Sequence, residues 1–237
     1  MSQWKAKRFW DDVNVEETEG GFRVLLDARV LNTPGKLPLV MPTREMADAV
    51  AGEWRAQEGY IQPLTMPHTR SANSAVERVT PQHAEVCAML AAYGETDLLC
   101  YRAESPDALT QRQAEAWDPL LDWAAERYGA RLKVVAGVLP VEQDAGAMAA
   151  LARVLQDSGP FQLTALHDLI TLTGSLVLGL AISEGRLSAN EGWDLSRIDE
   201  DWQIEQWGED EEAQRMAEAK RAQLLHAHDF WTLCFSR

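Results

Sequence analysis

The spacing of hydrophobic residues changes near residue 67, and this change limits the chain to a mixed fold. Before that point, apolar and polar residues alternate in short runs, as in half-buried strands. The alternating residues are Val13, Val15, Phe22, Val24 and Leu26. From residue 68 onward, apolar residues recur every three to four positions, as on amphipathic helices. We therefore expect an α+β protein, with a small sheet-plus-helix domain over 1–67 and a mainly α-helical domain over 68–237.

Two local signals refine the N-terminal part. Glu19-Gly20-Gly21 predicts the turn of a β-hairpin. Thr43 is a good N-cap for a helix with apolar positions at helical spacing. Those positions are Met46, Ala47, Val50, Ala51 and Trp54. The apolar residues between Ile61 and Met66 predict a last strand, limited to a sheet edge by its flanking prolines.

Leu163 to Ile182 is the longest apolar run. It contains His167 and Asp168, so a membrane span is a poor interpretation. The run predicts one central helix buried on most sides. Lys5, Lys7 and Arg8 are followed by acids rather than by an apolar stretch, so we expect no signal peptide.

The segment 193–212 combines acids and tryptophans in an unusual way. It contains nine carboxylates and a single basic residue, Arg197, and Trp193, Trp202 and Trp207 lie among them. Dense like charges repel one another while large aromatic side chains prefer burial, so a simple solvated helix seldom contains both. The mixture favours a surface that meets another protein.

Ser188 and Glu191 have capping-box spacing, and Gly208 predicts the end of the same helix. At about 100° per residue, the helix separates into three stripes. One is apolar (Leu195, Ile198, Trp202), and one is charged (Asp194, Asp201, Glu205). The third consists of Trp193, Glu200, Gln203, Ile204 and Trp207.

The third stripe leaves three hypotheses open. In the first, the helix is packed on two sides and Glu200 pairs with an internal arginine. In the second, the stripe is partly exposed and binds a partner. In the third, Glu200 is catalytic.

The net charge of −15 is concentrated after residue 80. Such a protein repels phosphate backbones and anionic lipids, so we expect no nucleic-acid binding and no membrane insertion. Basic protein surfaces are better partners. The three cysteines, Cys87, Cys100 and Cys234, are far apart and predict small reduced core residues in a cytoplasmic protein.

Other kinds of site lack their motifs. The five histidines form no HxxxH or HExxH pair, so we expect no metal. No GxSxG, GxGxxG or GxxxxGK[ST] motif appears, and Ser175 lies in an apolar segment where small residues allow close helix packing. The acids of 199–212 are numerous, but paired acid–base catalysis needs a cleft that separates their pKa values.

Several segments together resemble the ATP-twelve family, the assembly chaperones that attend the alpha subunit of the F-type ATP synthase. The segments keep their order over nearly the whole chain, and the ordered set is specific where each one is weak. They are Lys7–Trp10, Leu26–Pro34, Glu53–Gln57, Met66-Pro67, Thr96–Ala103, Trp117–Leu121, Leu172–Leu176, Asp199–Gln203 and Trp207-Gly208. Ala28 departs from the pattern, which has glycine in that turn, and leaves the turn type open.

The resemblance implies a protein that is not an enzyme and needs no cofactor. It implies binding to the unassembled alpha subunit, protecting it from aggregation before it meets the beta subunit. It also implies partner-binding residues in the acidic segment, and we expect these to be Glu200, Gln203, Trp207, Glu212 and Trp193. We expect a cytoplasmic monomer, with the mitochondrial matrix as the location of eukaryotic relatives.

Two rival functions stay open. A metal-dependent hydrolase would use the acids of 199–212 with a divalent ion, and would bring Glu200 and Asp210 together in a pocket. A non-selective acidic adaptor would bind basic proteins of any kind.

Overall fold

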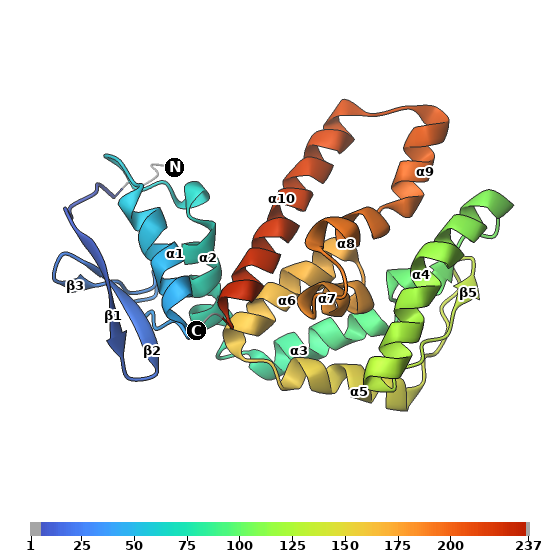
Figure 1. Cartoon of the computed structure of the whole chain (residues 1–237), viewed down its shortest axis with the longest axis horizontal. Coiled ribbons are helices and arrows are strands. Elements are labelled where there is room, and N and C mark those ends of the chain that lie inside the picture. Colours follow the sequence, from blue (N-terminus) through green and yellow to red (C-terminus); the bar gives the residue numbers. More distant parts are fainter. Residues whose placement is uncertain (1–5, 236–237) are drawn as a thin grey trace. The chain divides into compact units, whose positions relative to one another are not determined.

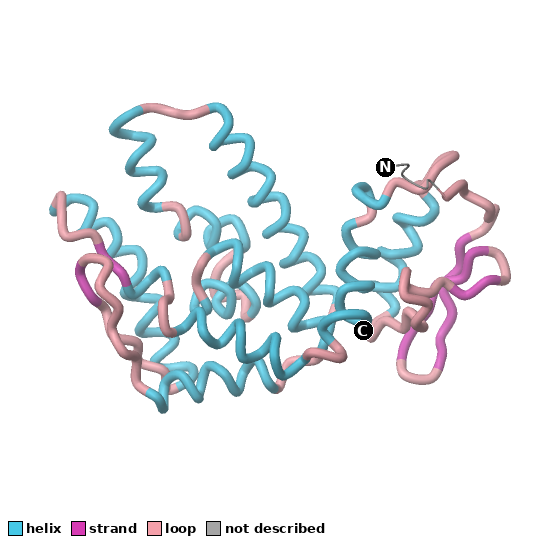
Figure 2. Tube along the Cα trace, turned by 180° about the vertical axis from the view of Figure 1, so that it is seen from behind, coloured by secondary structure: helices cyan, strands magenta, loops and turns pink. Residues whose placement is uncertain are grey.

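The structure is a computed structural model that describes residues 6–235, and it divides into two compact units. The N-terminal unit contains residues 6–82, 160–165 and 229–235, and the helical unit contains 83–159 and 166–228. Strands occur as a three-stranded sheet in the N-terminal unit and one short pair in the helical unit (Figure 2). The predicted α+β class is confirmed. The N-terminal unit takes in residues beyond the 67 predicted for the first domain.

The N-terminal unit has an antiparallel sheet of order β1-β2-β3 with helices beside it (Figure 1). Its elements are β1 (Val13–Thr18), β2 (Gly21–Leu26), β3 (Arg29–Val30), α1 (Arg44–Arg55), η1 (Pro63–Thr65), α2 (Pro67–Ser74) and η2 (Ala75–Val79). The predicted hairpin is confirmed, with Val15 opposite Val24. The Thr43 side chain accepts a hydrogen bond from the Met46 N–H, as an N-cap should.

Two details of this unit differ from expectation. Ile61 to Met66 form the 3₁₀-helix η1 and its flanks, not a strand, because Pro63 begins a helical turn. In the turn from β2 to β3, the left-handed residue is Asp27 (φ 54°), and its carboxylate accepts bonds from the N–H groups of Asp11 and Asp12. Ala28 is not in the left-handed region, so this turn does not require glycine there.

The core of the N-terminal unit lies between one face of the sheet and one face of α1. Val24, Met41, Met46 and Val50 are fully buried, and Trp10 is 2% exposed. Burying a large apolar side chain contributes about 1.5–3 kcal/mol, so this cluster is the main source of the unit's stability.

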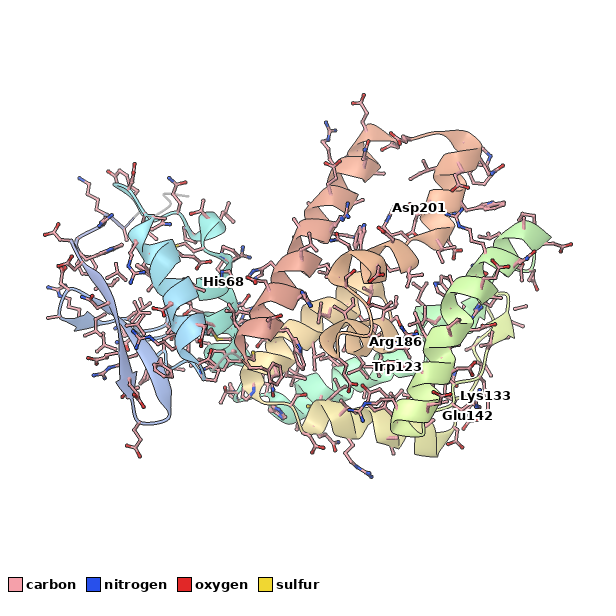
Figure 3. The ribbon with its side chains drawn as sticks, in the orientation of Figure 1. His68, Trp123, Lys133, Glu142, Arg186 and Asp201 are labelled. Carbon is pink, nitrogen blue, oxygen red and sulfur yellow. The ribbon has the colours of Figure 1, made fainter. Side chains whose placement is uncertain are left out.

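A polar network joins three helices of the same unit. Glu53 of α1 accepts hydrogen bonds from the N–H groups of His68 and Thr69 in the first turn of α2. The His68 ring contacts Glu53 at 3.0 Å and Asp229 at 2.8 Å, and its position is labelled in Figure 3. Burial lowers the pKa of His68, but its hydrogen bonds with the two carboxylates outweigh burial and raise it.

The helical unit is built around one short helix buried on all sides. Its elements are α3 (His83–Ala91), η3 (Ala92–Gly94), η4 (Leu98–Cys100), β4 (Tyr101–Arg102), α4 (Asp107–Tyr128), β5 (Val135–Ala136), α5 (Ala145–Gln156), α7 (Leu176–Ser183), α8 (Ala189–Leu195), α9 (Ile198–Trp207) and parts of α6 (Pro160–Thr173) and α10 (Glu211–Leu233). Every residue of α7 from Leu176 to Ile182 is buried. Glycines allow close packing: a Cβ on Gly192 of α8 would lie 2.4 Å from the Ile182 side chain.

The predicted single helix over 163–182 is wrong, because the chain breaks between α6 and α7. Gly174 adopts a left-handed conformation (φ 69°), and the Ser175 side chain accepts a bond from the Leu178 N–H as N-cap of α7. Asp97 stabilises this break from another part of the chain. Its carboxylate is fully buried and accepts bonds from Ser175 Oγ, Val177 N–H and Leu99 N–H. Burial raises the pKa of Asp97 to about 6, although these bonds oppose the shift.

The cysteines are free thiols. Cys87 and Cys100 are buried, whereas Cys234 is only half-buried.

Candidate partner-binding surface

The acidic segment forms two helices instead of the single predicted one. The capping box of Ser188 and Glu191 begins α8 as expected, but α8 ends at Leu195 and α9 begins at Ile198. The Trp117 indole N–H donates to the Leu195 carbonyl at 2.9 Å, so that carbonyl is held by a side chain of α4. Helical angles therefore do not continue from Trp193 to the residues of α9.

One side of α9 is fixed to α4. The Gln113 amide donates to Asp199 at 2.6 Å, and Gln113 itself is 1% exposed. Nearly two turns further along α9, Glu205 accepts a hydrogen bond from Arg112 at 2.8 Å. These contacts and the Trp117 bond determine which side of α9 faces its own unit.

The opposite side of α9 carries the predicted partner-binding residues. Glu200, Gln203 and Trp207 are exposed, and Trp207 is 80% exposed. Ile204 beside them is 36% exposed. A large aromatic side chain with so little cover is an anchor that a partner can bury.

The internal-brace hypothesis for Glu200 is wrong in this structure. The Glu200 side chain is 51% exposed, and its arginine contact is Arg197, one turn earlier at 3.5 Å. A pair this exposed contributes little stability. Arg197 also lies over the Trp193 ring, 5.5 Å from its centre.

Trp193 differs from the other four predicted residues. It is 6% exposed and lies in the core of the helical unit. Its side chain holds α8 and Arg197 in place, and it offers no surface to a partner in this conformation.

The first half of α10 extends the exposed surface. Within the described chain, residues 211–223 are all exposed except the half-buried Ala217. The Asp210 carboxylate caps α10 by accepting a bond from the Ala213 N–H. Figure 1 shows α9 and this part of α10 running in opposite directions, joined by a short loop. We call residues 198–223 the α9–α10 arm.

The arm carries both acids and apolar residues on its surface. Glu212 is exposed in the first turn of α10, and Met216 is 58% exposed one turn later. Helical spacing puts Met216 on the same stripe of α10 as Leu224 and Ala227, which are buried. Spacing alone does not show that the first half of this stripe has no cover.

A second surface feature was not expected from the sequence. Val138 and Leu139, in the loop before α5, are 91% and 76% exposed. Nearby, a hollow of roughly 630 Å³ is lined by Glu95, Met148 and neighbouring residues. The consecutive apolar residues of 134–139 were the sequence signal that could have indicated this exposed apolar loop.

The structure adds little support to the hydrolase alternative. Among residues 6–235, no three His, Cys, Asp or Glu side chains are grouped as metal ligands. Glu200 and Asp210 are exposed and line neither of the two hollows described in the helical unit.

No helix within 6–235 has the length and apolar character needed to cross a membrane.

An exposed, acid-edged aromatic surface on a helical arm is typical of the class of proteins that bind other proteins. Residues 7–125 match the profile of the ATP12 chaperone protein family. The chain is similar to the crystal structure of Atp12 from Paracoccus denitrificans, with 52% sequence identity and a TM-score of 0.95. The match covers 98% of this chain and all of the other. A lysine-substituted variant of the Paracoccus protein gives the same identity and coverage, with a TM-score of 0.96.

A third solved structure, Atu1473 from Agrobacterium tumefaciens, is of a protein suggested to be a chaperone. It is 44% identical, with a TM-score of 0.89, and the match covers 97% of this chain and 85% of the other. The chain therefore belongs to the ATP12 family of ATP synthase assembly chaperones.

Proposed function

We propose that this protein binds the unassembled alpha subunit of the F-type ATP synthase head and prevents its aggregation before it meets the beta subunit. The exposed α9–α10 arm is the observation that carries this proposal. Glu200, Gln203, Trp207 and Glu212 contact the client, while Trp193 supports them from the core.

The chemistry of the arm suits temporary protection. An unassembled subunit exposes an apolar interface edged with charge, which aggregates if it stays open. Trp207, Ile204 and Met216 supply apolar contact, and they are 80%, 36% and 58% exposed. Carboxylates around them favour fast, salt-sensitive exchange, which allows later release to the beta subunit.

We further propose that the protein acts in the cytoplasm as a monomer, without catalysis and without a cofactor. Light scattering combined with size-exclusion chromatography should then give the mass of one chain alone and of a one-to-one complex with the alpha subunit.

The decisive experiment measures aggregation of purified alpha subunit by light scattering, with and without this protein. The wild type should suppress scattering, and Glu200→Lys should suppress it less, because it reverses charge at the centre of the exposed face of α9. Glu126→Lys is the matched control, since Glu126 is an exposed acid on α4, outside the arm.

Absence of suppression by the wild type would refute the chaperone proposal. Equal suppression of unrelated clients such as lysozyme would favour the non-selective adaptor. A rise in melting temperature on adding Mg²⁺ or Mn²⁺ would favour the hydrolase instead.

A further inference from the structure

The helical unit uses the same local arrangement twice to hold an arginine. Arg102 lies 5.2 Å from the centre of the Trp117 ring and pairs with Asp118 at 2.8 Å. Arg197 lies 5.5 Å from the centre of the Trp193 ring. It also contacts Glu200 at 3.5 Å and Asp201 at 4.0 Å. In both places a guanidinium group has an aromatic face on one side and a carboxylate at its edge, which satisfies its charge and its planar shape together.

Trp207 has the aromatic half of this arrangement on the surface. This residue is 80% exposed, and none of the cation–ring contacts within residues 6–235 involves its ring. Gln203 and Glu200 precede it by four and seven positions, so all three lie on one face of α9.

The surroundings of Trp207 favour a cation over a purely apolar group. Ile204 is the exposed apolar neighbour on α9, whereas the segment that follows Trp207 is strongly acidic. Its acids, all exposed, are Glu209, Asp210, Glu211 and Glu212. A negative potential over an accessible indole ring strengthens its attraction for a positive charge.

We propose that Trp207, Gln203 and Glu200 form a recognition site for an arginine side chain on the client. This rests on the proposed function and specifies the chemistry of the partner at the same surface. The guanidinium stacks on the Trp207 ring and donates a hydrogen bond to the Gln203 amide oxygen one turn away. The Glu200 carboxylate, two turns from Trp207 and in contact with Arg197, adds attraction through its charge. Arginine suits the site better than lysine because its planar group can stack and donate at the same time.

The test uses the full-length protein and three 15-residue peptides of leucine and alanine with two variable positions. Those positions hold arginine, lysine or citrulline, the last being the neutral counterpart of arginine with nearly the same shape. Binding is followed through the indole N–H resonance of Trp207 in ¹⁵N-labelled protein, assigned by its loss in Trp207→Phe, and by calorimetry.

The arginine peptide should bind about fivefold more tightly than the citrulline peptide, as expected for an exposed cation–π contact with an added ion pair. Trp207→Leu keeps an apolar side chain and should abolish this preference, while retaining binding of the citrulline peptide. Leu139→Ala, a control at an exposed apolar position in the loop before α5 and outside the arm, should keep the preference. Because Trp207 is so exposed, Trp207→Leu should melt at the wild-type temperature, which separates recognition from folding.

Equal binding of the arginine and citrulline peptides, or an unchanged preference in Trp207→Leu, would overturn the arginine site. The alpha-subunit scattering assay distinguishes this result from failure of the chaperone function. If the wild type suppresses aggregation and Trp207→Leu does so equally well, the chaperone proposal stands and the arginine site does not. If the wild type fails to suppress aggregation, the chaperone proposal itself fails.

Discussion

Asp97 should make the stability of this protein depend on pH between about pH 4 and 6. Burial raises the pKa of its carboxyl from 3.8 to about 6 in the folded state. The folded protein therefore holds the proton more tightly than the unfolded chain. It follows that the stability associated with the protonated form is fully present below the unfolded pKa and is lost as the pH rises through about 6.

The size of the effect follows from the shift. A difference between 3.8 and about 6 corresponds to about 3 kcal/mol in total. About 2 kcal/mol of this is lost between pH 4.5 and 7.5, when both protonation equilibria are included. Asp97→Asn removes the titrating group but keeps its shape, so it should lack this part of the pH dependence.

The assay is urea unfolding, followed by circular dichroism, of wild type and Asp97→Asn at both pH values. From pH 4.5 to 7.5, the wild type should lose about 2 kcal/mol more stability than the variant. Parallel pH profiles for the two proteins would refute the reasoning. Asp97→Ala serves as a second variant, and should lose about 3–5 kcal/mol because it leaves three buried donors without their acceptor.

Two further substitutions test hydrogen-bonded contacts that hold helices together. His68→Gln should destabilise the protein more at pH 5.5 than at pH 9: the raised pKa of His68 means that its charged contacts with Glu53 and Asp229 are present at low pH and lost as the pH rises. An equal loss at both pH values in urea unfolding would contradict this. Trp117→Phe should cost about 2–3 kcal/mol, because the fully buried indole loses its bond to the Leu195 carbonyl. A cost below about 0.5 kcal/mol in the same assay would show that this bond does not hold the junction of α8 and α9.

Local sequence signals predicted the starts of helices well. Thr43 and Ser188 cap α1 and α8 as their spacing indicated. Such caps use the residue itself and the N–H groups two or three positions later, so they need no information from distant parts of the chain. The alternation at Val15 and Val24 predicted the hairpin for the same reason, because strand pairing across a short turn is local.

The breaks between helices within the apolar run and within the acidic run depend on hydrogen-bond partners that are distant in sequence. Gly174 permits a break, but Asp97, far away in sequence, accepts hydrogen bonds from the Val177 N–H and the Ser175 hydroxyl at that break. The carbonyl of Leu195 is bonded by Trp117 of another helix. No pattern within 163–182 or 188–207 contains these partners, so each run looked like one helix.

The sequence by itself determined the α+β class, the caps and the acidic, tryptophan-rich segment that is the candidate site. Only the tertiary structure decided that Trp193 is buried while Trp207 is 80% exposed, and that Glu200 lies on the surface. Periodicity shows which side of a helix is apolar or charged. It cannot show whether that side is covered by the same chain or left for a partner, because cover depends on how distant helices pack.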